Sequence, residues 1–225
     1  LLLRFGDIDP GDPDFPRYDQ ALLAEELERF PRWFVQSLLG QPWDAAAKAA
    51  WAPLAEALVG NALAQPVVLV HRDFHSRNLM PQSDGALGVI DFQDAVMGPV
   101  TYDLVSLLRD CYIRWPSRRV RDWALAYRQR LLAAGRLDGV SEQEFLTWFD
   151  LMGLQRHIKV LGTFARLYLR DGKPGYLADM PRVVGYVRET LGQYAGRFEA
   201  LHDFADWFDT ALSPVIARQS WGESP

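Results

Sequence analysis

The spacing of hydrophobic residues divides the sequence into a helical first part, a short β-rich centre and a long helical remainder. Apolar side chains recur at near-helical spacing over residues 17–39, where Pro31 predicts a kink or a break. An alanine-rich stretch that opens at Asp44 predicts a second helix, which should end near Gly60 and Asn61. Further helices are predicted over residues 101–114, 117–134, 141–170 and 179–210.

The centre of the chain carries two short apolar runs that are rich in β-branched residues. Residues 66–70 predict a buried strand, and residues 87–90 predict a second one after a turn at 83–85. The fold class expected from this pattern is α+β, mostly helical, with a small β element near the middle. Prolines and aspartates disfavour regular structure over residues 1–16, which are predicted to be a linker before a domain over residues 17–225.

Composition and charge narrow the classes of function. The chain has 225 residues, of which 49% are hydrophobic and 24% are charged, as is ordinary for a globular domain. The formal net charge of −5 argues against nucleic acid as a partner, because nucleic-acid binding needs a basic face. No apolar run has the length of a membrane span, so no membrane partner is expected. With a single cysteine, Cys111, no intrachain disulfide can form, and we expect a cytoplasmic protein.

The chemistry is concentrated between the two predicted strands, in the sequence HRDFHSRNLM at residues 71–80. It matches the kinase catalytic-loop pattern H-R-D-x-x-x-x-N at every fixed position. The spacing suits two tasks, since an aspartate can take the proton of an attacking hydroxyl while a nearby asparagine offers a carbonyl oxygen to Mg²⁺. Asp73 is therefore the candidate catalytic base, and Asn78 is a candidate metal ligand.

A second signal follows at the end of the next predicted strand, in the sequence VIDFQD at residues 89–94. Its first acid, Asp91, stands where the kinase pattern places the magnesium-binding aspartate of D-F-G. A polar turn with two capping acids would be the ordinary alternative for such a segment. Because the two motifs occur in the kinase order, we interpret them together as a phosphoryl-transfer site that uses Mg²⁺ and takes ATP as phosphate donor.

Departures from the protein-kinase pattern point to a small-molecule acceptor. Gln93 replaces the glycine of D-F-G, no A-P-E sequence follows, and the chain reaches Asp103 too soon for a long activation loop. Asp103 stands at a predicted helix start, where an acid is favourable on helix-dipole grounds. His75 occupies a position where protein-serine kinases usually carry lysine.

The loop signature H-x-D-x-H-x-x-N, formed here by His71, Asp73, His75 and Asn78, resembles that of the aminoglycoside phosphotransferase and choline kinase family. The resemblance implies the C-terminal lobe of a protein-kinase-like fold. It also implies that Asp103 braces the catalytic loop. We expect His71 to be a structural support, because a histidine beside a catalytic loop is often a packed, hydrogen-bonded spacer. His75 is a candidate contact to phosphate, or else a packed spacer.

Within that family, residues 152–194 resemble the bacterial kinases that phosphorylate N-acetylmuramate and N-acetylglucosamine at C1, and the two motifs do so as well. This implies a role in recycling cell-wall sugars. An anomeric hydroxyl is more acidic than an ordinary alcohol, so one carboxylate base would suffice. The candidate sugar contacts follow Asp91 or lie on the long predicted helix: Asp94, Gln155, Arg156 and His157. The last three could instead form a polar helix face, because the helical period puts Leu154, Ile158 and Leu161 on the buried side.

Two other functions are compatible with the same motifs. One is an aminoglycoside or choline kinase of the same fold, and the other is a non-catalytic sugar-binding module or pseudokinase. No G-x-G-x-x-G and no strand lysine precede His71, although kinases use both to hold the phosphates. The resemblance therefore implies that the nucleotide-covering lobe is missing, with residues 1–7 resembling the strand that leads into the interlobe hinge. We expect little activity from this chain alone.

Overall fold

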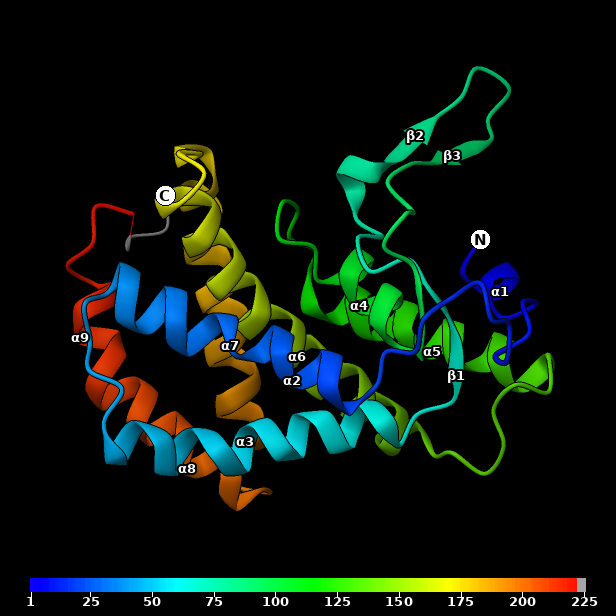
Figure 1. Cartoon of the computed structure of the whole chain (residues 1–225). Helices are drawn as coiled ribbons and strands as arrows, with labels where there is room; N and C mark the ends of the chain where they lie inside the picture. The colour runs from blue at the N-terminus through cyan, green and yellow to red at the C-terminus, as the bar shows by residue number, and fades with distance from the viewer. Residues whose placement is uncertain (222–225) are drawn as a thin grey trace. The chain divides into compact units, whose positions relative to one another are not determined.

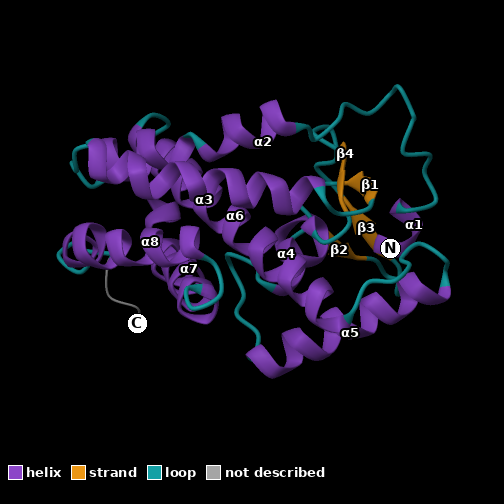
Figure 2. Cartoon of the chain, turned by 90° about the horizontal axis from the view of Figure 1, so that it is seen from below, coloured by secondary structure: helices purple, strands orange, loops and turns teal. Residues whose placement is uncertain are grey.

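The structure is a computed structural model that describes residues 1–221, and it is mostly helical with two small β-sheets (Figures 1 and 2). The α-helices are α1 (Leu2–Phe5), α2 (Gln20–Leu27), α3 (Ala45–Leu63), α4 (Tyr102–Leu108), α5 (Ser117–Ala133), α6 (Glu142–Leu169), α7 (Met180–Tyr194), α8 (Glu199–Trp207) and α9 (Ser213–Ile216). Within residues 1–221 the helical part also includes the π-helices η1 (Phe30–Leu38) and η4 (Phe208–Leu212) and the 3₁₀ turns η2 (Ser76–Asn78) and η3 (Pro174–Asp179). The predicted α+β class, mostly helical, is confirmed.

The chain forms two compact units, each built from two separate stretches of sequence. Unit 1 comprises Leu1–Asp19 and Asn61–Gly153, and unit 2 comprises Gln20–Gly60 and the chain from Leu154 onward. The boundaries fall inside α3 and α6. No helix within residues 1–221 is both long enough and apolar enough to cross a membrane.

The β element of unit 1 consists of two antiparallel pairs. Strand β1 (Val67–Val70) pairs with β4 (Val96–Pro99), and β2 (Leu79–Pro81) pairs with β3 (Leu87–Val89) to form a hairpin that projects from the rest of the unit (Figure 1). Both predicted strands, β1 and β3, are therefore confirmed. Their partners β2 and β4 were not predicted, because β2 has no β-branched residue and β4 ends in Gly98-Pro99, residues that usually indicate a turn.

The first residues of the chain depart from the expectation of an irregular segment. Residues 1–7 were expected to resemble a strand, but Leu2–Phe5 form the short helix α1. Prolines and aspartates begin only after this helix, so they do not oppose it. Apolar side chains from this segment pack against the buried cluster of Leu69, Ala95 and Met97; they are Phe5, Ile8 and Phe15. The segment is thus attached to β1 and β4 by hydrophobic burial.

The helix predicted over residues 17–39 is interrupted, as the proline suggested. It divides into α2 and the π-helix η1, and Pro31 stands in the first turn of η1, where a missing N–H costs little. The helix predicted over 179–210 ends at Tyr194 and restarts at Glu199. The Asp44 start is confirmed, since its carboxylate Oδ1 accepts the Ala47 N–H at 2.9 Å.

The core of unit 2 is aromatic. The ring of Phe30 stacks on Phe34 at 5.4 Å and on Trp51 at 5.3 Å between centroids, and Phe204 lies beside the same tryptophan at 5.9 Å. Gly162 of α6 lets the backbone of Arg29 approach so closely that a Cβ would lie 2.3 Å from the Arg29 carbonyl carbon. One helical turn earlier, the Lys159 ammonium pairs with the buried Glu26 carboxylate at 2.8 Å.

Candidate active site

The catalytic loop is attached to the start of α4 by a buried carboxylate. Asp103 is 4% exposed, and its Oδ2 accepts the His71 N–H at 2.7 Å while its Oδ1 accepts the Arg72 N–H at 3.1 Å. Arg72 has φ of +73°, a conformation unusual outside glycine, so two hydrogen bonds hold a strained turn in place. This is the contact expected of a residue that braces the loop.

Asn78 joins the other two candidate residues of the reaction. Its Nδ2 donates to the Asp73 backbone oxygen at 3.0 Å and lies 3.4 Å from Asp91 Oδ2. Asn78 is 9% exposed and sits at the end of the turn η2. Both contacts use the amide nitrogen, and the amide Oδ1 accepts no hydrogen bond within residues 1–221.

Asp91 follows β3 and is exposed. Its φ of +70° is a costly conformation for an aspartate, of the kind that collects at functional sites. Gln93, which replaces the D-F-G glycine, donates from Nε2 to Asp91 Oδ1 at 2.7 Å. The departure from the kinase pattern therefore supplies a side chain that orients the candidate metal-binding carboxylate.

The two histidines of the loop have different surroundings. His71 is 3% exposed, and its Nε2 lies 3.0 Å from the Ile90 backbone oxygen, next to Asp91. His75 is half-buried, and its ring forms a T-shaped pair with that of Tyr112, with 5.2 Å between centroids. These contacts suit a supporting role for His71, whereas His75 retains an exposed part.

The candidate sugar contacts are divided between the two units. Asp94 belongs to unit 1, is exposed, and accepts a hydrogen bond from Arg72 Nη1 at its backbone oxygen, at 3.3 Å. Gln155, Arg156 and His157 belong to unit 2 and are 0%, 3% and 0% exposed.

The alternative that these three residues form a solvated polar face is wrong. The structure buries every residue from 151 to 162, so the helical period underestimated how much of α6 is enclosed. The ring of His157 stacks on Tyr186 at 4.6 Å, while neither polar atom of the Gln155 amide has a hydrogen-bond partner in the described chain.

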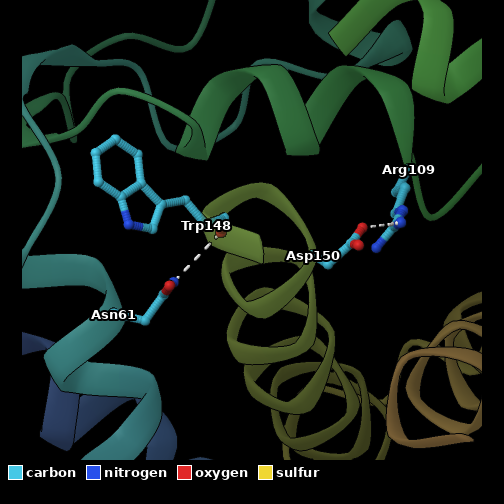
Figure 3. A network of polar contacts seen from close by, with 4 residues as sticks. All are labelled: Asn61, Arg109, Trp148 and Asp150. Atoms are coloured by element: carbon cyan, nitrogen blue, oxygen red, sulfur yellow. Dashed lines mark hydrogen bonds and ion pairs between the residues drawn. The ribbon is translucent and has the colours of Figure 1, made fainter. Parts of the chain in front are cut away.

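Polar contacts link α6 to α3 and to the end of α4, and the pKa of a half-buried tyrosine of α5, Tyr127, is shifted. Arg109, at the end of α4, pairs with the Asp150 carboxylate of α6, and Asn61 Nδ2 donates to the Trp148 backbone oxygen at 3.3 Å (Figure 3). Burial, together with the Asp103 carboxylate, raises the pKa of Tyr127 to about 12.

Sequence reasoning missed Asp110. This residue is 1% exposed, and its Oδ2 accepts the Ser76 N–H of the catalytic loop at 2.8 Å. No signal in the sequence marked it, because the helix predicted over residues 101–114 extends past Asp110.

No three His, Cys, Asp or Glu side chains gather as a metal-ion cluster in the part of the chain that the structure describes. Mg²⁺ does not require one, because it commonly uses one or two protein oxygens together with water and substrate phosphates. The Asn78 amide oxygen and the Asp91 carboxylate form such a set of hard oxygen donors. These residues therefore fit the ion that the motifs predict.

Comparison with known proteins identifies relatives that share one name. N-acetylmuramate/N-acetylglucosamine kinase of Pseudomonas putida is 49% identical over 192 residues, which cover 85% of this chain and 56% of the relative. The protein of the same name from Neisseria meningitidis is 46% identical over 180 residues, covering 80% of this chain and 54% of the relative. The protein of the same name from Caulobacter vibrioides is 35% identical over 212 residues, which cover 90% of this chain and 53% of the relative.

The chain spans about half the length of the curated relatives it matches. Residues 1–140, which include both motifs, match the model of the phosphotransferase enzyme family. The resemblance inferred from His71, Asp73, His75 and Asn78 is confirmed. The chain belongs to the phosphotransferase enzyme family.

Proposed function

We propose that this chain is the catalytic and sugar-binding part, the C-terminal lobe, of a cytoplasmic kinase that transfers phosphate from ATP to the anomeric hydroxyl of N-acetylmuramate or N-acetylglucosamine. The observation that carries the proposal is the Asn78 amide, which contacts both Asp73 and Asp91 and so brings the two kinase motifs into one site. The shared name of the relatives supports the choice of sugar.

In the proposed reaction the Asp73 carboxylate accepts the proton of the C1 hydroxyl. The C1 oxygen forms a bond to the terminal phosphorus of ATP, the bond from that phosphorus to the bridging oxygen breaks, and ADP leaves. Asp73 is half-buried in a loop whose backbone is held at Asp103 and Asn78, so the base does not have to reorganise. Positioning and charge stabilisation then supply most of the catalysis.

Mg²⁺, where bound, would neutralise negative charge on the phosphates. Asn78 Oδ1 and the Asp91 carboxylate are the residues that would hold it, with Gln93 fixing the carboxylate orientation. His75 is proposed to contact a phosphate through the exposed part of its ring.

For the sugar, Gln155 is the best supported of the four candidates. A fully buried amide without partners costs free energy, and an acetamido group would offer it both a donor and an acceptor. Arg156 and His157, its neighbours on α6, and Asp94 of unit 1 are proposed as further contacts.

Methyl glycosides of the two sugars test the anomeric assignment, because they block the C1 oxygen while leaving the rest of the ring unchanged. The full-length gene product should phosphorylate free N-acetylglucosamine and N-acetylmuramate but not their methyl glycosides. Phosphorus nuclear magnetic resonance should identify a 1-phosphate coupled to the anomeric proton. A 6-phosphate product, or turnover of the glycosides at the rate of the free sugars, would overturn the C1 assignment.

A further inference from the structure

Beyond Asp103, the catalytic loop has a second attachment, at Asp110 and Tyr112. Asp110 follows the end of α4 and is 1% exposed. Each carboxylate oxygen accepts one backbone N–H: Oδ2 from Ser76 and Oδ1 from Tyr112, both at 2.8 Å. A buried carboxylate with two backbone donors is a strong, directional attachment. Asp110 therefore ties the catalytic loop to the segment after α4.

Tyr112 extends this attachment to the residues on either side of Ser76. Its ring and that of His75 form a T-shaped pair, with 5.2 Å between centroids and an interplanar angle of 87°, and the Arg77 guanidinium lies 3.5 Å from the Tyr112 ring centroid. Both contacts are favourable, because the π-face of tyrosine attracts positive charge and ring edges. Three consecutive loop residues are thus held by Asp110 or by Tyr112.

Asp110 is itself fixed by its neighbour in the sequence. Arg109 pairs with Asp150 of α6, and its guanidinium lies 4.9 Å from the Phe149 ring centroid (Figure 3). Gly153, one turn further along α6, leaves room for that side chain, since a Cβ there would lie 3.1 Å from Arg109 Nη1. The backbone next to Asp110 is therefore anchored to α6, and both belong to unit 1.

Residues 75–77 lie between the candidate base and the candidate metal ligand. The Asn78 N–H donates to the His75 backbone oxygen at 3.0 Å, so a shift of this segment would move Asn78 with it. The same shift would move Asp73, because its backbone oxygen accepts a hydrogen bond from the Asn78 amide.

We propose that Asp110 and Tyr112, here called the loop clamp, are positioning residues that set the placement of Asn78 relative to Asp73 for phosphoryl transfer. This inference rests on the proposed function. The clamp acts through the loop and does not contact substrate.

The kinetic test uses Asp110→Ala and Tyr112→Leu in the full-length gene product, with Asp122→Ala, an exposed residue of α5, as matched control. Each clamp variant should lower kcat by about 10- to 100-fold, because small misplacements of reacting groups cost this much. The KM for sugar should stay within about threefold, and the Mg²⁺ concentration for half-maximal rate should rise, which loss of a purely structural residue would not produce. Tyr112→Phe, which keeps the ring, should recover most of the activity lost in Tyr112→Leu.

Unchanged kcat and unchanged Mg²⁺ dependence in both folded clamp variants would overturn the proposal. Circular dichroism establishes whether the variants fold. If Asp110→Ala does not fold, Tyr112→Leu still tests the proposal. A separate arm needs no activity: amide hydrogen exchange at Ser76 and Tyr112 should be slow in the wild-type chain and fast in Asp110→Ala. If the wild type phosphorylates no sugar, the proposed function fails, while slow exchange at these two amides would still support the clamp and fast exchange would refute it.

Discussion

At the scale of single residues, a small number of side chains join the two motifs into one candidate site. Asn78 contacts the Asp73 backbone and the Asp91 carboxylate, and Asp103 holds the start of the loop through two backbone amides. Each of these contacts involves a buried or half-buried partner, so none is easily replaced by water.

The change Asp73→Asn removes the proposed base while preserving the shape of the side chain. Turnover in the full-length gene product should fall by about 10²- to 10⁴-fold, because an amide cannot accept the proton of the C1 hydroxyl. The KM for sugar should change little, since the Asp73 carboxylate is assigned no ground-state role. Asp203→Asn, at an exposed position of α8, is the control. Turnover of Asp73→Asn within a few-fold of wild type would exclude Asp73 as the base.

Tyr127 gives a pH dependence whose sign can be worked out. Its pKa is raised from 10.0 to about 12 in the folded chain, chiefly by burial and secondarily by the Asp103 carboxylate. The unfolded chain therefore loses this proton first, so the stability that the neutral phenol contributes is present below pH 10 and is lost as the pH rises through about 12.

Urea unfolding at pH 8 and pH 11 checks this prediction. Between these values the wild type should lose about 1 kcal/mol more stability than Tyr127→Phe, which has no ionisable hydroxyl. The same loss in both proteins would show that Tyr127 ionises normally.

Most of the candidate catalytic residues could be predicted from sequence, because their spacing in the kinase motifs is itself the signal. Asp110 and Tyr112 could not, since a carboxylate that binds backbone amides leaves no pattern of residue types around it. The burial of Gln155 was also missed. Periodicity assigns one face of a helix to the core, whereas α6 is enclosed on all sides over residues 151–162.

At the scale of secondary-structure elements, close backbone approach fixes the packing of η1 on α6. Gly162→Ala would place a Cβ 2.3 Å from the Arg29 carbonyl carbon and 2.6 Å from the Phe30 nitrogen, and neither backbone atom can rotate away. We expect the variant to lose about 2–3 kcal/mol of unfolding free energy.

The control for this prediction is Gly192→Ala in α7, where nothing lies within 4 Å of the added Cβ. That change should gain about 0.5–1 kcal/mol, because alanine restricts the unfolded chain and favours helix. Denaturant unfolding of both variants gives the comparison. Equal stability of Gly162→Ala and wild type would mean that the two helices separate without cost.

Helices and strands were predicted better than strand pairing. The runs that became β1 and β3 are apolar and β-branched, but local pattern carries no information about partners. β1 pairs with β4, and Gly98 of β4 lets Tyr18 approach closely, since a Cβ at this position would lie 3.0 Å from the Tyr18 Cβ. Such a tertiary fit cannot be inferred from one sequence.

At the scale of the whole molecule, the proposed reaction needs groups on both sides of the transferred phosphate. The sequence before His71 contains neither a G-x-G-x-x-G loop nor a strand lysine. We therefore expect the 225-residue chain, assayed alone, to phosphorylate N-acetylglucosamine orders of magnitude more slowly than the Pseudomonas putida relative, of which it spans 56%.

A coupled assay of ADP release under identical conditions makes this comparison. The rate measured for the 225-residue chain carrying Asp73→Asn serves as the background. Turnover comparable to that of the relative would mean that the 225 residues already hold the phosphates adequately.

The discontinuous make-up of the two units has a consequence for synthesis. Unit 1 has all its residues once Gly153 has left the ribosome, whereas residues 20–60 must wait for the chain from Leu154 onward. At about 5–20 residues per second, the 72 residues from 154 to 225 take roughly 4–14 seconds to synthesise. During this time Phe30 lacks its contact with Phe204 and Phe34 lacks its contact with Trp221. The nascent segment therefore exposes apolar side chains to chaperones, proteases and aggregation.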